Sequence, residues 1–375
     1  MNPADSLRKV RTILPPVPGR FKRVKGEQRI REAFEKIPQI TNETVAEHRE
    51  GILRGARKYK YPLAHSKHRI VIISTALSIL AVVAFLVYIG LALYKFQSSS
   101  SFMYRVTQVL PVPVARAGSH FVTYENYLFE LRRYQHYYQT QQRVDFNGQD
   151  GKNQLDRYRP VAMEQVVQAA YVKQLASQNK VSVSGAEVDA ELASLQAQNQ
   201  TTRQELADVT NKFFGWSLDD LRRQIKQELL AQKVAAKLDK SSHAKADAAL
   251  AQLRGGADFA AVAAQVSEDV STKDKAGQYA NTAITSASTD VPAAVARKLQ
   301  SMQPGQVSEV VVTGDTLEIV KLLGRDTDGK MQAAHISFSL KPIESFVDEY
   351  AKKHPKHIFI ALPEVSQQAR AETGR

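Results

Sequence analysis

The longest run of apolar positions in this chain lies well inside the N-terminal third. Residues 70 to 94, IVIISTALSILAVVAFLVYIGLALY, contain no charged side chain. As a helix this run is about 37 Å long, enough to cross a hydrocarbon core of about 30 Å with some tilt. The alternative is a buried helix of a soluble core, but such helices are usually shorter. The pattern therefore predicts one membrane-spanning helix at 70–94.

Charge is distributed unevenly about this run. The net charge is +13, and residues 1–69 hold 17 Lys and Arg against 7 Asp and Glu, which leaves about +3 for the remainder. A flank rich in Lys and Arg precedes the run, and KFQSSSS with one Lys follows it. The positive-inside bias places residues 1–69 in the cytoplasm and residues 95–375 outside. No small-residue cleavage site follows, so the run is interpreted as an anchor rather than a signal peptide.

The cytoplasmic segment 1–69 is basic and contains Pro15, Pro16, Pro18 and Pro38. Few apolar residues cluster in it, so it is predicted to be largely disordered and to lie close to anionic headgroups. A topogenic tail is the simplest interpretation, and a specific cytoplasmic partner is the alternative.

Composition excludes several kinds of chemistry. The chain has no cysteine, so disulfides, thiolate metal sites and cysteine nucleophiles are ruled out. Its nine histidines show no HExxH spacing, and there is no GxxxxGK[ST] or GxGxxG motif. Because the excess positive charge is confined to the first 69 residues, nucleic acid is not an expected partner. No metal and no cofactor are expected.

Polar and apolar spacing then changes twice. Residues 95–120 are predicted to be a linker and a β-rich segment interrupted by prolines. Residues 121–240 have helical spacing, with Thr123 as a candidate N-cap and Ser217 with Asp220 as a capping box. One face of the first helix collects Tyr124, Tyr127, Leu128, Leu131 and Tyr134.

The next hundred residues mix both periodicities. Helices are predicted at 244–253, 258–265 and 292–302, the last with a proline in its first turn. Two β-rich runs, VSEVVVT and TLEIVKLL, flank Gly314–Asp315, a hairpin dipeptide. A further strand is predicted at 331–340 in MQAAHISFSLKP, with a histidine in it.

The helical segment resembles the N-terminal chaperone region of bacterial extracytoplasmic foldases of the SurA, PrsA and PpiD kind. The opening VTYENYL resembles the family pattern VTYxEYL through Val122, Thr123, Tyr124, Tyr127 and Leu128. The resemblance implies a domain that holds unfolded or nascent secreted polypeptides, with the tyrosine-rich run 124–138 as a client-binding surface. A generic helical bundle, with these aromatic side chains in its core, is the alternative.

The following segment resembles parvulin-type peptidyl-prolyl isomerases through LRGGADFAAVAAQVSEDVSTKDKAGQYA and MQPGQVSEVV. That family begins with a histidine-bearing strand of the type A.HIL, which is missing before His243. AAHISFSL occurs instead after the last strand. Because the family's first and last strands are antiparallel neighbours, a hairpin from 316–323 into 331–340 would restore the sheet. We therefore expect a circularly permuted parvulin domain at 241–342. A second parvulin domain and an unrelated edge strand are the alternatives.

The resemblance also implies site residues. His335 matches the first-strand histidine, Asp269 matches the Asp-or-Cys position, and Glu318 stands where GYHIIK has the second histidine. A structural role for His335 and turn chemistry for Asp269 are the alternatives. The candidate substrate-binding residues are Tyr279, Met302 and Phe338. AGQYANT replaces GG.LG.F, so the wall that would hold a proline ring is thinned.

Taken together, the expected fold class is α+β. A single transmembrane helix, a helical SurA-N-like chaperone domain and a parvulin-like domain with a small antiparallel sheet follow one another, and residues 343–375 form a tail of unassigned role. The expected function is that of a membrane-anchored extracytoplasmic foldase with isomerase and chaperone activity. The alternative is a non-catalytic chaperone or scaffold that keeps the parvulin fold as a binding module.

Overall fold

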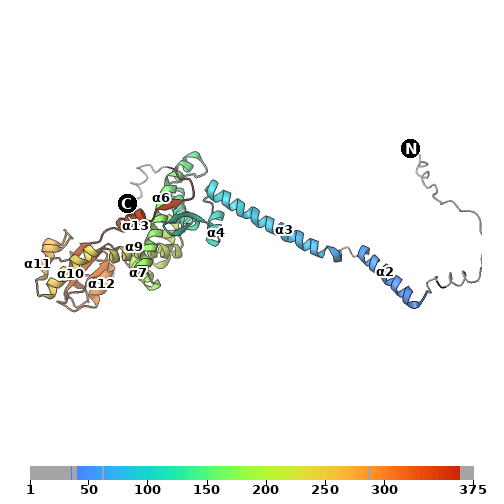
Figure 1. Cartoon of the computed structure of the whole chain (residues 1–375). Coiled ribbons are helices and arrows are strands. Elements are labelled where there is room, and N and C mark those ends of the chain that lie inside the picture. The colour runs from blue at the N-terminus through green and yellow to red at the C-terminus, as the bar shows by residue number, and fades with distance from the viewer. Residues whose placement is uncertain (1–34, 36–39, 61–62, 286–287, 364–375) are drawn as a thin grey trace, which may run out of the picture. The chain divides into compact units, whose positions relative to one another are not determined.

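The computed structural model describes residues 35, 40–60, 63–285 and 288–363 (Figure 1). The chain forms two compact units, Met1–Ala84 and Phe85–Arg375. Within the first unit, residues of the segment predicted to be largely disordered form a helix, α2 (Asn42–Lys60). Thr41 and Thr44 exchange backbone and hydroxyl hydrogen bonds at its start, which explains where it begins. The disorder predicted for residues 1–34 lies outside the described residues.

The predicted span is helical throughout. α3 (Leu63–Gly90) continues into a π-helical turn at Leu91–Lys95. Arg69–Lys95 is a helix that is long and apolar enough to cross a membrane, judged by length and composition. The side chains from Arg69 to Tyr88 are exposed, as they would be in a helix surrounded by lipid.

The segment after the span differs from the prediction. Residues predicted to be β-rich form a helix, α4 (Ser101–Val109). Ser100 caps it by accepting a hydrogen bond from the Met103 backbone N–H. Met103 and Thr107, one turn apart, are buried. The cap and this one-sided burial outweigh the strand preference of the β-branched valines.

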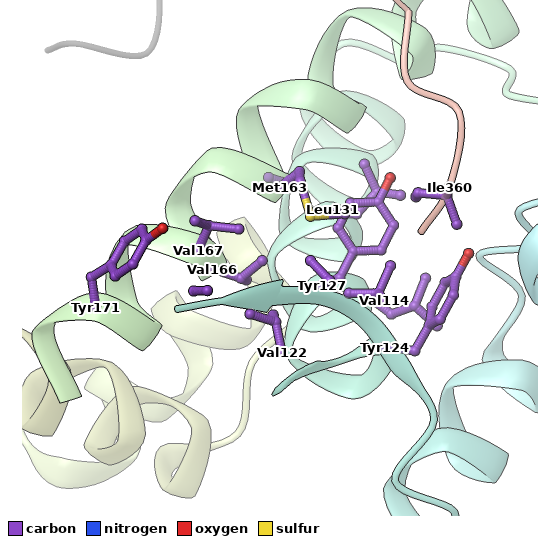
Figure 2. Close-up of a cluster of buried hydrophobic side chains, with 14 of the residues drawn as sticks. Val114, Val122, Tyr124, Tyr127, Leu131, Met163, Val166, Val167, Tyr171 and Ile360 are labelled. Atoms are coloured by element: carbon purple, nitrogen blue, oxygen red, sulfur yellow. The ribbon is translucent and has the colours of Figure 1, made fainter. Parts of the chain in front are cut away.

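A helical lobe follows, made of residues 85–238 together with 343–363. Its helices are α5 (Tyr124–Gln141), α6 (Gln149–Gln178), α7 (Gly185–Asn199), α8 (Arg203–Phe214) and α9 (Leu218–Leu238). The predicted N-cap Thr123 and the capping box of Ser217 with Asp220 are confirmed. Tyr124 and Tyr127 are 0% and 1% exposed and lie in the lobe's core (Figure 2). Tyr134 and Tyr138 are half-buried against the same cluster, and Tyr137 is 37% exposed, so the start of the tyrosine-rich run is core and its end reaches the surface.

Residues 343–363 of the predicted C-terminal tail belong to this lobe, and residues 364–375 lie outside the described part of the chain. α13 (Ile343–Lys353) packs against α6 and α9. Strand β6 (Lys356–Ile358) joins β1 (Pro113–Ala117) and β2 (His120–Thr123) in a sheet of order β2-β1-β6. Ile360, just beyond β6, lies in the cluster shown in Figure 2. The amphipathic face of α13 and the open edge of β1 explain this docking, because both need a partner to bury them.

The sheet lobe comprises residues 240–340 and is inserted between α9 and α13. Its strands β3 (Val311–Thr313), β4 (Thr316–Arg325) and β5 (Met331–Ser339) form an antiparallel sheet of order β3-β4-β5. The predicted hairpin turn at Gly314–Asp315 and the predicted strand at 331–340 are confirmed. β5 pairs with β4 along its whole length, from Met331 opposite Arg325 to Ser339 opposite Thr316.

Helices cover both faces of this sheet. α10 (Lys240–Arg254) and α11 (Phe259–Val266) pack on the face that carries Ile336 and Phe338. α12 (Ala293–Gln300) packs on the other face, which carries Met331 and Ala333. Since side chains alternate along a strand, His335 lies on the α12 face. The histidine therefore lies on the other side of the sheet from the apolar cluster under α10 and α11, at the edge of the smaller cluster under α12.

Candidate active site

His335 lies near the middle of β5 and is 5% exposed. Its two ring nitrogens face two carboxylates: Nδ1 is 3.1 Å from Glu318 Oε2, and Nε2 is 3.0 Å from Asp269 Oδ2. Glu318 comes from the neighbouring strand β4, two residues before Val320, the residue paired with His335. The three predicted catalytic residues, far apart in the sequence, therefore meet at one place. A ring that donates from both nitrogens satisfies both contacts.

Asp269 is held by the loop that follows α11. It accepts hydrogen bonds from the Ser271 backbone N–H at 2.9 Å, the Ser271 hydroxyl at 2.7 Å and the Thr272 hydroxyl at 2.7 Å. Burial alone would raise the pKa of Asp269, but these donors, together with the nearby imidazole of His335, lower it to about 2. The carboxyl group is therefore an anion at neutral pH, fixed beside the His335 ring.

Tyr279 packs against the face of the His335 ring. Its ring stacks on the imidazole with centroids 4.1 Å apart, and its hydroxyl donates to Glu318 Oε2 at 2.6 Å. Burial raises the pKa of Tyr279, and the negative charge of Glu318 raises it further. The phenol thus stays protonated and fixes the orientation of a carboxylate that is only 4% exposed.

Backbone contacts fix the histidine as firmly as side chains do. The His335 N–H donates to the Gly277 carbonyl at 2.7 Å, and the Tyr279 N–H donates to the Ala333 carbonyl at 3.1 Å. Gly277 has φ +73°, and a Cβ there would lie 2.4 Å from the His335 carbonyl oxygen. Only glycine permits this close approach. The loop 276–280 therefore acts as a short additional edge beside β5.

An open pocket of about 430 Å³ lies over this constellation. His335, Asp269, Glu318 and Tyr279 line it. Further carbon surface comes from Ala280 and Pro292, and the remaining lining side chains are polar or charged. Such a pocket can accept an extended peptide segment and offers its amides many hydrogen-bond partners, but its apolar contact area is small.

Met302 and Phe338 lie away from the pocket. Met302 is 4% exposed among the side chains under α12, and Phe338 is 1% exposed among those under α10 and α11. Both are core residues of the sheet lobe. Strand alternation explains the placement of Phe338, because it lies on the opposite face of β5 from His335.

Two residues that hydrogen-bond to the site, Ser271 and Thr272, were not predicted from the sequence. Thr272 lies with its Oγ1 2.9 Å from His335 Nε2, and Ser271 donates twice to Asp269. Their signal is present in DVST, because Ser and Thr two and three residues after an Asp commonly close an Asx turn. Within the described residues, no group of three or more His, Asp and Glu side chains has the arrangement of a metal site.

Comparison with known families agrees with both lobes. Residues 225–324 match the family model described as the PPIC-type PPIASE domain, and residues 64–235 match the SurA-like N-terminal domain. The first match contains Asp269, Tyr279 and Glu318 and ends before β5, so it does not include His335.

Individual relatives are more distant. The chain is 29% identical over 193 residues to the chaperone SurA of Thiobacillus denitrificans. This alignment covers 52% of this chain and 36% of that protein. It thus spans about a third of the length of that relative. Among solved structures, the foldase protein PrsA of Streptococcus pneumoniae is 22% identical, over 56% of this chain and 82% of that one, with a TM-score of 0.18. PrsA of Bacillus anthracis is 18% identical, over 50% and 86%, with a TM-score of 0.17. The matched segments are thus similar to a SurA-like N-terminal domain and to a PPIC-type isomerase domain.

Proposed function

We propose that this protein is a membrane-anchored extracytoplasmic foldase that catalyses cis–trans isomerisation of X–Pro bonds in unfolded or nascent secreted polypeptides. The observation that carries the proposal is the imidazole of His335 held between Asp269 and Glu318 beneath an open pocket. The matches to a PPIC-type isomerase domain and a SurA-like domain support it. The apolar helix Arg69–Lys95 and its basic N-terminal flank support anchoring with residues 1–69 in the cytoplasm.

The chemistry needs neither a nucleophile nor a metal. Amide resonance gives X–Pro rotation a barrier of about 18–20 kcal/mol, and the uncatalysed step takes tens to hundreds of seconds. An enzyme lowers this barrier by binding the twisted bond better than either planar form. Here the charged and hydroxyl groups around His335 are fixed before substrate arrives, so they stabilise the altered charge of the twisted imide without reorganising.

We also propose that the sheet lobe is a circularly permuted parvulin domain, with β5 as its first strand delivered last. Three features support this interpretation. β5 carries the histidine, it pairs antiparallel with β4, and the family match ends at residue 324, before β5 begins. The loop residue Gln278 forms an antiparallel bridge to Ala334, on the edge of β5 that faces away from β4. β5 therefore has neighbours on both sides, as an inner strand of a sheet does.

A second function is favoured by one observation, the small carbon surface of the pocket. Tyr279, Ala280 and Pro292 supply it, whereas gripping a proline ring requires an apolar wall. A pocket of this kind binds peptide backbone without strongly favouring the twisted imide. The alternative function is therefore a non-catalytic chaperone or scaffold for envelope proteins, in which the sheet lobe serves as a binding module.

A prolyl-peptide isomerisation assay on the full chain in detergent separates the two functions. His335→Ala and Asp269→Ala are expected to lower the catalysed rate by about tenfold or more, which corresponds to ~1.4 kcal/mol, the order of one buried hydrogen bond. His357→Ala, at an exposed position of β6, is the matched control and should keep the full rate. A folded wild-type chain with no rate above background would eliminate the isomerase function and leave the binding module as the alternative.

A further inference from the structure

The outer face of α4 is apolar and uncovered. Phe102 is 54% exposed and Val109 is 80% exposed, and the exposed Arg105 lies between them on the same side of the helix. The opposite side is buried through Met103 and Thr107. Isolated exposed apolar residues are common on protein surfaces, but here two of them share one face of a nine-residue helix.

Contacts with α5 hold α4 in place. The Arg132 guanidinium donates to the Ser99 carbonyl at 2.9 Å and lies over the Tyr104 ring, 5.2 Å from its centroid. The Gln135 side-chain amide donates to Ser99 Oγ at 2.8 Å. The start of α4 and the linker before it are therefore tied to one helix of the lobe core, and the exposed face has a fixed direction relative to that helix.

The end of the span is tied to the same helix. Leu93 is 0% exposed, and its carbonyl accepts a hydrogen bond from the hydroxyl of Tyr124, the first residue of α5. The ring of Tyr94 packs edge-on against Tyr124 with centroids 5.7 Å apart, and its hydroxyl donates to the Pro113 carbonyl at 2.5 Å. Tyr124 and Arg132 lie about 12 Å apart along the axis of the same helix, α5. Since one holds the end of the span and the other holds the start of α4, these two elements are kept at a fixed separation.

The residue that links them is also exposed and apolar. Phe96, directly after the span, is 69% exposed. The five residues from Phe96 to Ser100 can extend over at most about 18 Å, so α4 must begin close to the point where the span leaves the bilayer. Aromatic side chains and arginine are the residues that favour the headgroup layer, where apolar and charged surroundings meet.

We propose that the outer face of α4, together with Phe96, lies in the headgroup layer of the bilayer that the span crosses. The occupant of this surface is the phospholipid interface: Phe102 and Val109 insert among the upper acyl chains, and Arg105 meets phosphate oxygens. The inference rests on the proposed function, because it requires the span to cross a membrane. Its consequence is that the helical lobe is held at a fixed attitude to the lipid surface rather than tethered by a loose linker.

Site-directed fluorescence tests this directly, because the chain has no native cysteine to remove. Phe102→Cys and Val109→Cys are labelled with an environment-sensitive fluorophore in the full chain, reconstituted in phosphatidylethanolamine–phosphatidylglycerol vesicles. Leu80→Cys, at an exposed position of the span, reports on anchoring itself, and Val312→Cys, at an exposed position of the sheet lobe, is the aqueous control. Quenching of the α4 and Val312 probes is measured with lipid carrying a nitroxide close to the headgroup, and quenching of the Leu80 probe with lipid carrying the nitroxide near the end of an acyl chain, because Leu80 lies near the middle of the span. Quenching of all four probes by aqueous iodide is measured separately.

We expect lipid quenching at Phe102 and Val109 to be several-fold stronger than at Val312, with weaker iodide quenching. If the Leu80 probe is quenched by lipid while the α4 probes behave like Val312, the inference is overturned and the anchor stands. If Leu80 is not quenched either, the anchoring proposal and the inference fail together. Protection of the α4 probes from both quenchers that increases with protein density would assign the face to a second copy of the chain, which also overturns the inference.

Discussion

Replacing Phe338 tests whether β5 is an essential strand of the sheet lobe rather than an appended edge. The Phe338 side chain is 1% exposed and lies in the cluster formed with α10 and α11. Burial of a phenylalanine side chain contributes about 1.5–3 kcal/mol by transfer from water, and core Phe→Ala substitutions, which also leave a cavity, cost about 3–5 kcal/mol. Since domains are stable by about 5–15 kcal/mol, Phe338→Ala should remove a large part of the lobe's stability.

The measurement is urea unfolding, monitored separately for each lobe by the hydrogen exchange of its peptides. With an m value of about 1–3 kcal/mol per molar urea, a loss of about 3–5 kcal/mol should lower the urea midpoint of the sheet lobe by roughly 1–5 M. Trp216, the single tryptophan, stacks on Phe129 in the helical lobe and gives an independent signal that should change much less. Leu323→Ala, 38% exposed on β4, is the matched control and should cost below about 1 kcal/mol. Unchanged exchange of β4 in Phe338→Ala would show that β5 is an appended edge and not an essential strand of the sheet lobe.

Two further predictions concern carboxylates that accept several hydrogen bonds. Asp269→Asn should destabilise the folded chain at neutral pH by about 1–2 kcal/mol, because it weakens charge-assisted hydrogen bonds in a partly exposed site. The folded pKa of about 2 lies below the ordinary aspartate value of 3.8, so this contribution is complete above about pH 5 and is lost as the pH falls toward 2. In acid titrations the stabilities of the two chains should converge, and a constant difference would contradict the role given to Asp269. Asp239 caps α10 and also accepts from the Lys341 backbone N–H at 2.8 Å, so it joins the entry and exit of the sheet lobe. Asp239→Ala should lower the free energy of unfolding by about 2–4 kcal/mol. The control Asp258→Ala removes only a cap of α11 and should lower it by about 1 kcal/mol. Equal effects in calorimetry would show that the hydrogen bond to Lys341 is unimportant.

Local sequence was sufficient for much of the site. Alternation along β5 put His335 and Phe338 on opposite faces, and the turn dipeptide Gly314–Asp315 located the β3–β4 hairpin. Asp269, Glu318 and His335 were expected to act together through family resemblance, and they do lie within hydrogen-bond distance. Their contact depends on strand register and on the loop after α11, which are long-range features that a local pattern cannot specify.

The sequence alone determined the elements whose causes are local: the apolar run of the span, the capped helices and the alternating strands. It could not determine where exposed faces find partners. The β-branched segment after the span became α4 because a cap and a buried face outweighed its propensity. The C-terminal segment returned to the helical lobe because α13 and β6 fit surfaces formed by residues some two hundred positions earlier. Burial of such faces is a property of the assembled core, so only the tertiary structure decided them.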